Sequence, residues 1–305
     1  MTDSPTSATP YEVLGVPATA SHDELRRAYK RLLRTTHPDV GGDAGRFIAV
    51  QQAWERVATP EDRAAYDRGS SRESDQREAW AQPAGGAPRR DSRPTARSYG
   101  HPGGWRRERY LQLMREWVGR GVELDDPYDP ALVRTAPWEI RHTLADALAE
   151  EATARQLATL GIGYTVWHDV DSGRAGEKID HVVLGPTGLF AILSEDFGGE
   201  VRTRRGELIG ESLAGEEPIR SLAVRAKALT RATRVKFSAL LVVLPDDALA
   251  EPLLEVGSVR GALTAAVRHS VLPSVLRAGL PGTRQVGGVD IFDVRTKLQS
   301  AIRFV

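Results

Sequence analysis

Apolar and polar residues follow two different patterns along this chain, and the change of pattern divides it into regions. From residue 9 to residue 69, apolar side chains recur every three or four positions, which is typical of amphipathic helices. From residue 138 to residue 305, helical periodicity alternates with short, nearly continuous apolar runs, which predicts an α/β domain. The pattern therefore predicts two domains, a small all-α one followed by a larger α/β one.

The segment 70–104 lies between these domains and has little apolar character. It is rich in Ser, Gly, Pro and Arg, so it cannot bury enough apolar surface to offset the entropy cost of folding. We expect a flexible linker here, a disordered tail over 1–8, and a short helix with an irregular connector over 105–137. Because a linker of this composition behaves as a loose coil, the two domains are expected to have no fixed relative orientation.

Three helix starts in the first domain carry the same capping chemistry. Thr9, Ser21 and Thr59 each place a hydroxyl before a helix, and an acidic residue follows three positions later. Gly15 is well placed to end the first helix, because glycine readily adopts the left-handed backbone conformation of a C-cap. These signals predict a compact all-α unit over residues 9–69.

The second helix of this unit has one apolar face and one basic face. The apolar face carries Leu25, Ala28, Tyr29, Leu32 and Leu33. The basic face carries Arg26, Arg27, Lys30, Arg31 and Arg34. Like charges one turn apart repel by a few tenths of a kcal/mol per pair, roughly. Such a face is either simply solvated or serves to dock an acidic partner.

This helix is predicted to end at the tripeptide His37-Pro38-Asp39. Proline lacks the amide donor and pushes the preceding residue out of helical geometry, so the chain turns there. The turn displays an imidazole and a carboxylate between two antiparallel helices. No nucleophile or set of metal ligands surrounds them, so the arrangement indicates presentation to a partner and not catalysis.

The segments YEVLGV, ELRRAYKRLLRTTHPDV and AVQQAWERVATPEDRAAYDRG resemble a DnaJ-type J-domain over its whole length. The resemblance implies an all-α helical hairpin that binds a DnaK-type chaperone and stimulates its ATP hydrolysis. It also implies that Asp39 engages an arginine of the chaperone, while the basic helix meets an acidic surface. The chaperone-binding residues implied in this way are Arg26, Arg27, Tyr29, Lys30, His37, Pro38 and Asp39.

The second domain, 138–305, is predicted to contain a mixed sheet with helices. The expected helices cover 138–160 and 217–233, and the expected strands cover 164–170, 178–184, 188–193 and 236–244. The segment IDHVVLGPTGLFAI and the preceding glutamate-bearing helix resemble a nuclease-related domain of the restriction-endonuclease-like group. That resemblance implies an α/β fold in which acidic side chains bind a divalent cation.

The acidic and basic residues that this resemblance implies are only partly present. Asp180 matches the first acid and Glu150 matches the glutamate of the helix, but the D/E-x-K triplet aligns with Leu193-Ser194-Glu195. Leucine cannot ligate magnesium, and glutamate reverses the charge at the lysine position. We therefore expect a degenerate site, with no catalytic residue, no bound metal and no cofactor.

An active site remains an alternative at the same residues. Side chains alternate along a strand, so residues 193 and 195 are expected to share a face. Glu195 could then join Asp180 and Glu150 as a magnesium ligand in a metal-dependent nuclease. A third reading is a scaffold that binds nucleic acid without cutting it. His181, next to Asp180 in a strand, is expected to point to the other face and to be structural.

The composition of the chain limits the kinds of functional site and partner that are possible. The chain has no cysteine, which excludes disulfides, thiolate metal sites and a cysteine nucleophile. Lys plus Arg equals Asp plus Glu at 41 each, so net charge favours no polyanionic partner. A nucleic acid stays a candidate partner through the C-terminal domain or through linker residues Arg89, Arg90, Arg93 and Arg97. The client protein is not identified.

The start of the chain holds neither the basic residues nor the apolar run of a signal peptide. The longest apolar stretch, 237–244, is too short to cross a bilayer. We therefore expect a cytoplasmic protein with no membrane partner. The function predicted is that of a J-domain co-chaperone whose C-terminal domain selects a client or a location.

Overall fold

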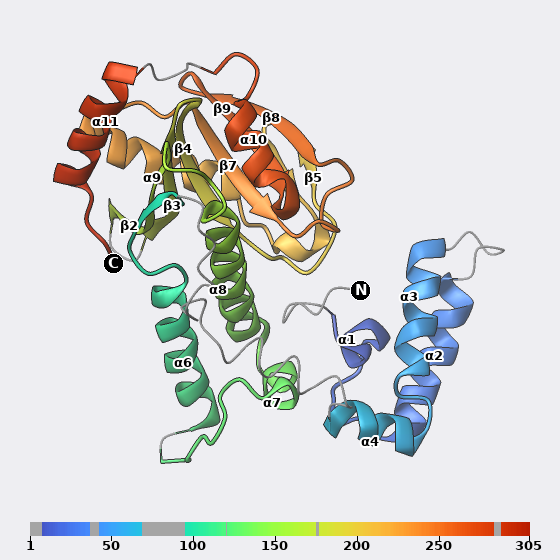
Figure 1. Ribbon diagram of the computed structural model, residues 1–305. Helices are drawn as coiled ribbons and strands as arrows, with labels where there is room; N and C mark the ends of the chain where they lie inside the picture. Colours follow the sequence, from blue (N-terminus) through green and yellow to red (C-terminus); the bar gives the residue numbers. More distant parts are fainter. Residues whose placement is uncertain (1–7, 37–42, 69–94, 120, 175–176, 284–287) are drawn as a thin grey trace.

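The structure is a computed structural model that describes residues 8–36, 43–68, 95–119, 121–174, 177–283 and 288–305. It contains a small helical unit near the N-terminus and a larger unit built around a mixed sheet (Figure 1). The fold class predicted from the sequence is confirmed for both units.

The helical unit contains the predicted helices. They are α1 (Pro10–Leu14), α2 (His22–Thr36), α3 (Ala44–Glu55) and α4 (Pro60–Arg68). Leu14, Leu25, Val50 and Val57 are fully buried at the centre of this unit. The apolar stripe of α2 therefore packs on α1 and α3, as its periodicity indicates.

The cap of α1 shows why the sequence signals at these helix ends are reliable. The backbone N–H of Glu12 donates to the hydroxyl of Thr9 at 3.2 Å, and the Thr9 N–H donates to the Glu12 carboxylate at 2.8 Å. Gly15 then ends the helix with a φ of 65°, a conformation that costs a residue with a Cβ more than it costs glycine. The capping box and the glycine C-cap both involve only residues that are close together in the sequence.

A seven-stranded sheet forms the second unit, in the order β1-β2-β3-β4-β7-β9-β8. Strands β2, β3 and β4 form an antiparallel meander, β4, β7 and β9 run parallel, β1 runs parallel to β2, and β8 runs antiparallel to β9. The strands are β1 (Arg97–Tyr99), β2 (Thr165–Arg174), β3 (Glu177–Gly185), β4 (Gly188–Ser194), β7 (Ala239–Leu244), β8 (Leu253–Val259) and β9 (Ala262–Arg268). A separate two-stranded ribbon pairs β5 (Arg202–Arg204) with β6 (Glu207–Ile209).

Helices cover both faces of this sheet, so each face has its own core. On one face α9 (Pro218–Thr233) packs Leu222 and Leu229 against strand residues such as Val182 and Leu193. Helix α11 (Gly288–Ala301) lies beside α9. The other face is covered by α8 (Trp138–Leu157) and α10 (Leu272–Ala278). Burial on both faces explains the nearly continuous apolar runs of β4 and β7.

The structure corrects the predicted end of the linker. Residues 97–99 form β1 and pair with β2, and α6 (Gly104–Val118) follows directly. The backbone of β1 pairs with a strand more than sixty residues away, which its own Ser- and Arg-rich sequence could not indicate. Residues 70–94 of the predicted linker, Gly69 before it and residues 1–7 of the predicted tail lie outside the described residues.

Helix α6 belongs to the α/β unit and is not a free connector. Its Tyr110 and Met114 are fully buried against α7 (Pro130–Thr135) and α8, in a small apolar cluster that includes Val133 and Leu144. This packing places the first turn of α6 beside the strands that carry Asp180 and Glu195.

Two side-chain contacts join the helical unit to the α/β unit, whereas the linker composition predicted no fixed orientation. The Arg141 guanidinium on α8 pairs with the carboxylate of Glu12 on α1. Arg134 on α7 lies 5.4 Å from the ring centroid of Tyr66 on α4, a cation–π distance. These contacts involve α1 and α4, which lie nearer to α7 than α2 does in Figure 1.

Candidate functional site

Five carboxylates and two cations form a buried network where α6 and α8 meet the sheet. We call this network the ionic cluster. Its members are Asp146, Glu150, Asp169, Asp180, Glu195, Arg106 and Lys178. All three acidic residues predicted from the sequence, Glu150, Asp180 and Glu195, belong to it.

Arg106, on the first turn of α6, neutralises one half of the ionic cluster. Its Nε donates to Glu150 Oε1 at 2.6 Å and its Nη2 donates to Glu195 Oε1 at 3.1 Å. Its Nη1 also donates to the Asp146 carboxylate. The Arg106 side chain is only 15% exposed, so these charge-assisted hydrogen bonds are poorly screened by solvent. One guanidinium therefore ties α6 to α8 and to the end of β4.

Lys178, on β3, neutralises the other half. Its Nζ lies 2.6 Å from Glu150 Oε2, 2.6 Å from Asp169 Oδ1 and 3.0 Å from Asp180 Oδ1. The side chain of Lys178 is 3% exposed. All three hydrogens of its ammonium group thus have carboxylate acceptors within the fold.

Asp180 is held ionised by this surrounding. Burial alone raises the pKa of a carboxyl, but the charges of Lys178 and Arg106 and the N–H of Ser194 outweigh burial and lower the pKa of Asp180 to about 2. The Ser194 N–H donates to Asp180 Oδ2 at 2.8 Å. Both oxygens of Asp180 therefore already have partners within the protein.

Glu150 is shifted in the opposite direction. Burial, together with the neighbouring charge of Asp180, raises the pKa of Glu150 to about 8. Both oxygens of Glu150 are nevertheless occupied by donors: Oε1 accepts from Arg106, and Oε2 lies beside the Lys178 ammonium and accepts from the Gly103 N–H at 3.0 Å. The fold therefore already uses the atoms with which Glu150 would ligate a divalent cation.

The positions that the nuclease-related resemblance implies as metal ligands do not converge on an open site. Leu193 lies in the apolar core with 1% exposure. Glu195 lies one residue beyond the end of β4, and its N–H still donates to Val243 O at 3.1 Å, so the expectation that residues 193 and 195 share a face stays a prediction. Glu195 joins the ionic cluster, where Arg106 binds it. The arrangement fits a neutralised remnant better than a magnesium site.

His181 lies outside the ionic cluster, as the strand alternation predicts. Its Nδ1 lies 2.7 Å from His168 Nδ1, and His168 Nε2 lies 2.8 Å from the hydroxyl of Ser98 on β1. Burial and the nearby charge of Lys178 lower the pKa of His168 to about 4, so the ring is neutral at pH 7. The histidine pair therefore connects β1, β2 and β3 by hydrogen bonds.

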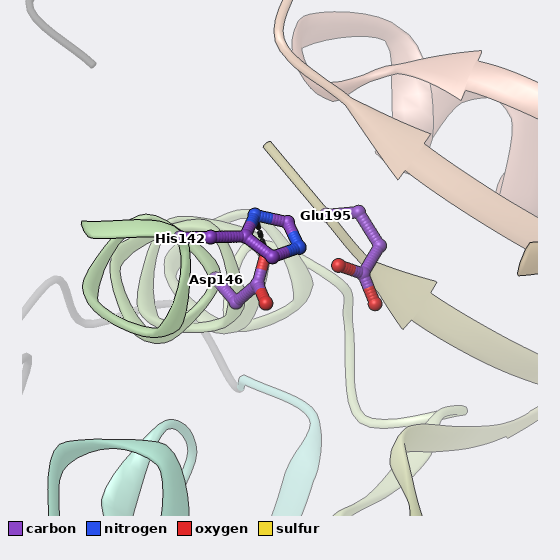
Figure 2. Close-up of side chains that lie close together, drawn as sticks. All are labelled: His142, Asp146 and Glu195. Carbon is purple, nitrogen blue, oxygen red and sulfur yellow. Dashed lines mark ion pairs between the residues drawn. The ribbon is translucent and has the colours of Figure 1, made fainter. Parts of the chain in front are cut away.

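One further group, at the rim of the ionic cluster, offers metal-ligand atoms. Among the described residues, His142, Asp146 and Glu195 form the one set whose ligand atoms all lie within 4.8 Å of one another. Figure 2 shows the imidazole between Asp146, one turn along α8, and Glu195 at the end of β4. The spacing of His142 and Asp146, four residues apart on a helix, was the sequence signal that could have revealed this pair.

This group is also neutralised by cations of the protein itself. Burial alone lowers the pKa of a histidine, but Asp146 and Glu216 outweigh burial and raise the pKa of His142 to about 9. A protonated imidazole cannot ligate a metal. Arg106 in addition binds both carboxylates of the group. The three side chains do not fit a resident metal while Arg106 and the His142 proton are in place.

The cations on the basic face of α2 differ from those of the ionic cluster, because they are exposed and have no ion-pair partner among the described residues. Arg26, Arg27, Lys30, Arg31 and Arg34 are all exposed. Within the described parts of the chain, none of them forms an ion pair or donates a side-chain hydrogen bond. Tyr29 is half-buried and stacks on Trp54 with ring centroids 4.6 Å apart, so its docking role stays a prediction. His37, Pro38 and Asp39 lie outside the described residues.

The sequence analysis missed Arg106 and Lys178, which decide the character of the C-terminal site. Sequence patterns give an indication of Lys178 but none of Arg106. Lys178 stands two residues before Asp180 and so shares its strand face, but Arg106 lies at the edge of a segment without strong periodicity. Nothing in the local sequence indicates that this arginine turns inward.

Comparisons with known proteins match the two units separately. The DnaJ domain family matches residues 9–67, and the nuclease-related domain family matches residues 145–244. None of the solved structures matches the chain. Within the described residues, no helix combines the length and the apolar character needed to span a bilayer.

The similar curated proteins are chaperones that share only the first unit. Chaperone protein dnaJ A6 of Oryza sativa subsp. japonica is 52% identical over 58 residues, which are 19% of this chain and 14% of that protein. Chaperone protein DnaJ of Tropheryma whipplei is 52% identical over 59 residues, 19% of this chain and 17% of that protein. Chaperone protein DnaJ of Gloeothece citriformis is 49% identical over 61 residues, 19% and 16% of the two chains.

The matched segment therefore spans less than a fifth of each of these relatives. Its helices, caps and basic face are those described above for residues 9–68. The second family match includes strands β2, β3, β4 and β7, while β1, β8 and β9 of the same sheet lie outside it. The chain thus combines an N-terminal DnaJ domain with a C-terminal nuclease-related domain.

Proposed function

We propose that this protein is a co-chaperone whose DnaJ domain binds a DnaK-type chaperone and stimulates its ATP hydrolysis. The nuclease-related domain then selects the client or the location. The observation that carries the proposal is the row of exposed, unpaired cations on α2, in a domain that matches the DnaJ family. We expect this activity in the cytoplasm.

The fold leaves the positive charge on the exposed face of α2 without ion-pair partners among the described residues. Arg26, Arg27 and Lys30 are exposed and form no ion pair within the described chain, so they can attract an acidic partner surface. Of these three, only Arg27 is near enough to a carboxylate, that of Glu24, to add to the hydrogen bonds that lower its pKa. The resemblance to J-domains adds Asp39, whose carboxylate would form a charge-assisted contact with an arginine of the chaperone. Such contacts accelerate encounter and fix the orientation of the two proteins.

The C-terminal domain has a binding or architectural role in this proposal, and no catalytic one. Its acidic residues are already hydrogen-bonded to Arg106 and Lys178. A metal ion would have to displace at least one of these buried cations, and separating a buried ion pair costs several kcal/mol, roughly. A metal-dependent nuclease is therefore the alternative and not the main proposal.

The co-chaperone role is tested by charge reversal on α2. Stimulation of ATP hydrolysis by a bacterial DnaK-type chaperone is measured with the wild-type chain and with Arg27→Glu. Arg46→Glu on α3 is the matched control, because Arg46 is also an exposed arginine of the same domain. We expect Arg27→Glu to reduce stimulation about tenfold at low salt while Arg46→Glu stays near wild type. Equal loss in both variants would contradict the proposal.

The alternative is tested by cleavage. The purified chain is incubated with plasmid and with single-stranded DNA in the presence of magnesium or manganese. We expect no cleavage. Cleavage by the wild-type protein that disappears in Asp180→Ala would assign nuclease activity to the ionic cluster and overturn the non-catalytic role.

A further inference from the structure

A second surface of the nuclease-related domain carries cations that the fold leaves unpaired. A pocket of about 300 Å³ opens between the C-terminal half of α9, the start of β7 and the turn between β8 and β9. Its floor is apolar and includes Phe237 and Leu240, which are buried. Four cations line it, namely Lys227, Arg231, Lys236 and Arg260.

Of the described residues that line this pocket, none is acidic. Across the part of the chain that the structure describes, Lys227, Arg231, Lys236 and Arg260 make no ion pair and no side-chain hydrogen bond. The proximity of Arg260 and Arg231 lowers the pKa of Lys227, which shows that these charges repel one another. A bound anion would relieve that repulsion.

Another pocket of the same domain provides an internal comparison. It has a similar volume of about 320 Å³ and is also lined by two arginines, Arg174 and Arg220. There, however, Arg174 pairs with Glu177 at 2.9 Å and Arg220 pairs with Glu217 at 2.9 Å. That pocket neutralises its own cations, so the uncompensated charge of the first pocket is not a general property of this surface.

We propose that the pocket beside Lys227 and Arg231 binds a nucleotide unit, with its phosphate on the cations and its base or sugar on the apolar floor. Guanidinium groups suit phosphate because they donate two parallel hydrogen bonds. The hydroxyl of Thr230 also lines the pocket and can donate to a phosphate oxygen. A volume of about 300 Å³ is at the lower end for small-molecule sites, and so suits one nucleotide.

The apolar floor of the pocket, together with the four cations that line it, favours a nucleotide over an acidic protein segment. Aspartate and glutamate side chains offer a carboxylate with a short aliphatic stem, which would leave most of the apolar floor unfilled. The ligand is either a free nucleotide or one unit of a nucleic-acid strand, since both present the same chemistry. The inference gives a ligand class to the binding role proposed for this domain. Its test does not involve the chaperone, so the two proposals can fail separately.

The test measures binding of a fluorescent single-stranded oligonucleotide to the full chain by anisotropy, at several salt concentrations. We expect binding by the wild type that weakens steeply with salt, as for phosphate contacts. Lys227→Gln combined with Arg231→Gln should reduce the affinity at least tenfold and lower the salt slope by about one to two. Arg202→Gln combined with Arg220→Gln is the matched control, because it removes the same charge from exposed, ion-paired arginines.

Ala223→Met provides a variant that changes no charge. Ala223 is half-buried at the pocket, so a longer side chain should fill the space above the floor and weaken binding several-fold. Competition by AMP would assign the pocket to free nucleotides, and competition by oligonucleotides alone would assign it to a strand. The proposal is overturned if the wild type binds neither the oligonucleotide nor fluorescently labelled AMP, if both double variants lose affinity equally, or if polyglutamate competes as well as the nucleotide probe.

Discussion

Two sets of cations in this protein have opposite surroundings. Arg26, Arg27 and Lys30 on α2 are exposed and unpaired within the described chain, whereas Arg106 and Lys178 are buried and each contacts three carboxylates. The first set can attract an acidic partner. The second set has its charge satisfied by the fold, so it holds the domain together and keeps other cations away from the acids.

A chain of zero net charge can therefore still offer charged residues for binding, provided that the fold leaves them unpaired. Residue type alone does not separate the two sets, because both consist of Arg and Lys near acidic residues in sequence or in space. What separates them is whether the fold supplies the counter-charge. The acidic residues of the ionic cluster are thus paired with cations of their own domain, whereas the basic residues of α2 have no ion-pair partner in the described chain.

Removal of Arg106 tests the structural half of this comparison and has the largest expected effect. Arg106→Ala leaves Asp146, Glu150 and Glu195 buried without their shared cation. We expect the free energy of unfolding of the α/β domain to fall by about 3–5 kcal/mol. Denaturant unfolding followed by tryptophan fluorescence measures this change, because Trp167 is buried in the sheet.

Arg115→Ala is the control for that measurement. Arg115 lies on the same helix but is exposed, so its removal should change stability by less than about 0.5 kcal/mol. If Arg106→Ala is no more destabilising than Arg115→Ala, the ionic cluster does not hold the domain together, and its acids are free for other ligands.

The parts of the fold that the sequence predicted are those determined by neighbouring residues. The caps at Thr9 and Thr59 depend only on residues a few positions away. The apolar runs of β4 and β7 show directly that these strands are buried. The structure contains each of these elements close to its predicted range. Glu150, Asp180 and Glu195 were predicted as one site and do lie in one cluster.

The parts that the sequence did not predict depend on contacts between distant segments. Residues 97–99 become a strand only because β2 accepts them as a neighbour. Arg106 is buried only because α6 packs on α8, and that packing brings it to Glu195, 89 residues away. A local sequence pattern cannot distinguish Arg106 from the exposed arginines on α2. The sequence therefore could not predict that an arginine binds the acidic side chains of the site.

The pH dependence of stability gives a second test of the ionic cluster. The pKa of His142 in the folded protein is about 9, above the usual value of about 6.5 that applies to the unfolded chain. The raised pKa contributes stability that is fully present below pH about 6.5 and is lost as the pH rises through about 9. We expect a loss on the order of 1–3 kcal/mol, measured as the free energy of unfolding from pH 6 to 10.

His142→Gln should flatten this alkaline decline, because it removes the titrating group that faces Asp146, Glu195 and Glu216. His101→Gln serves as the control, since His101 is exposed and forms no ion pair with the described acids. A decline that is unchanged in His142→Gln would show that another group causes it.

The contact between the two domains has the smallest expected effect. Glu12→Gln retains an oxygen that can cap α1 but removes the charge that pairs with Arg141. An ion pair with a half-exposed carboxylate contributes at most about 1 kcal/mol, so stability should hardly change. We expect instead that the amide groups of the DnaJ domain tumble faster in NMR relaxation experiments. Equally fast tumbling in the wild type would contradict the contact.

The central claim is that this protein acts on a DnaK-type chaperone through its DnaJ domain. The most direct measurement is the single-turnover rate of ATP hydrolysis by a bacterial chaperone of that type, at low salt, with the full chain and with Asp39→Asn. We expect clear acceleration by the wild type and none by Asp39→Asn, with both proteins equally folded by circular dichroism. No acceleration by the wild type, or equal acceleration by both proteins, would contradict it.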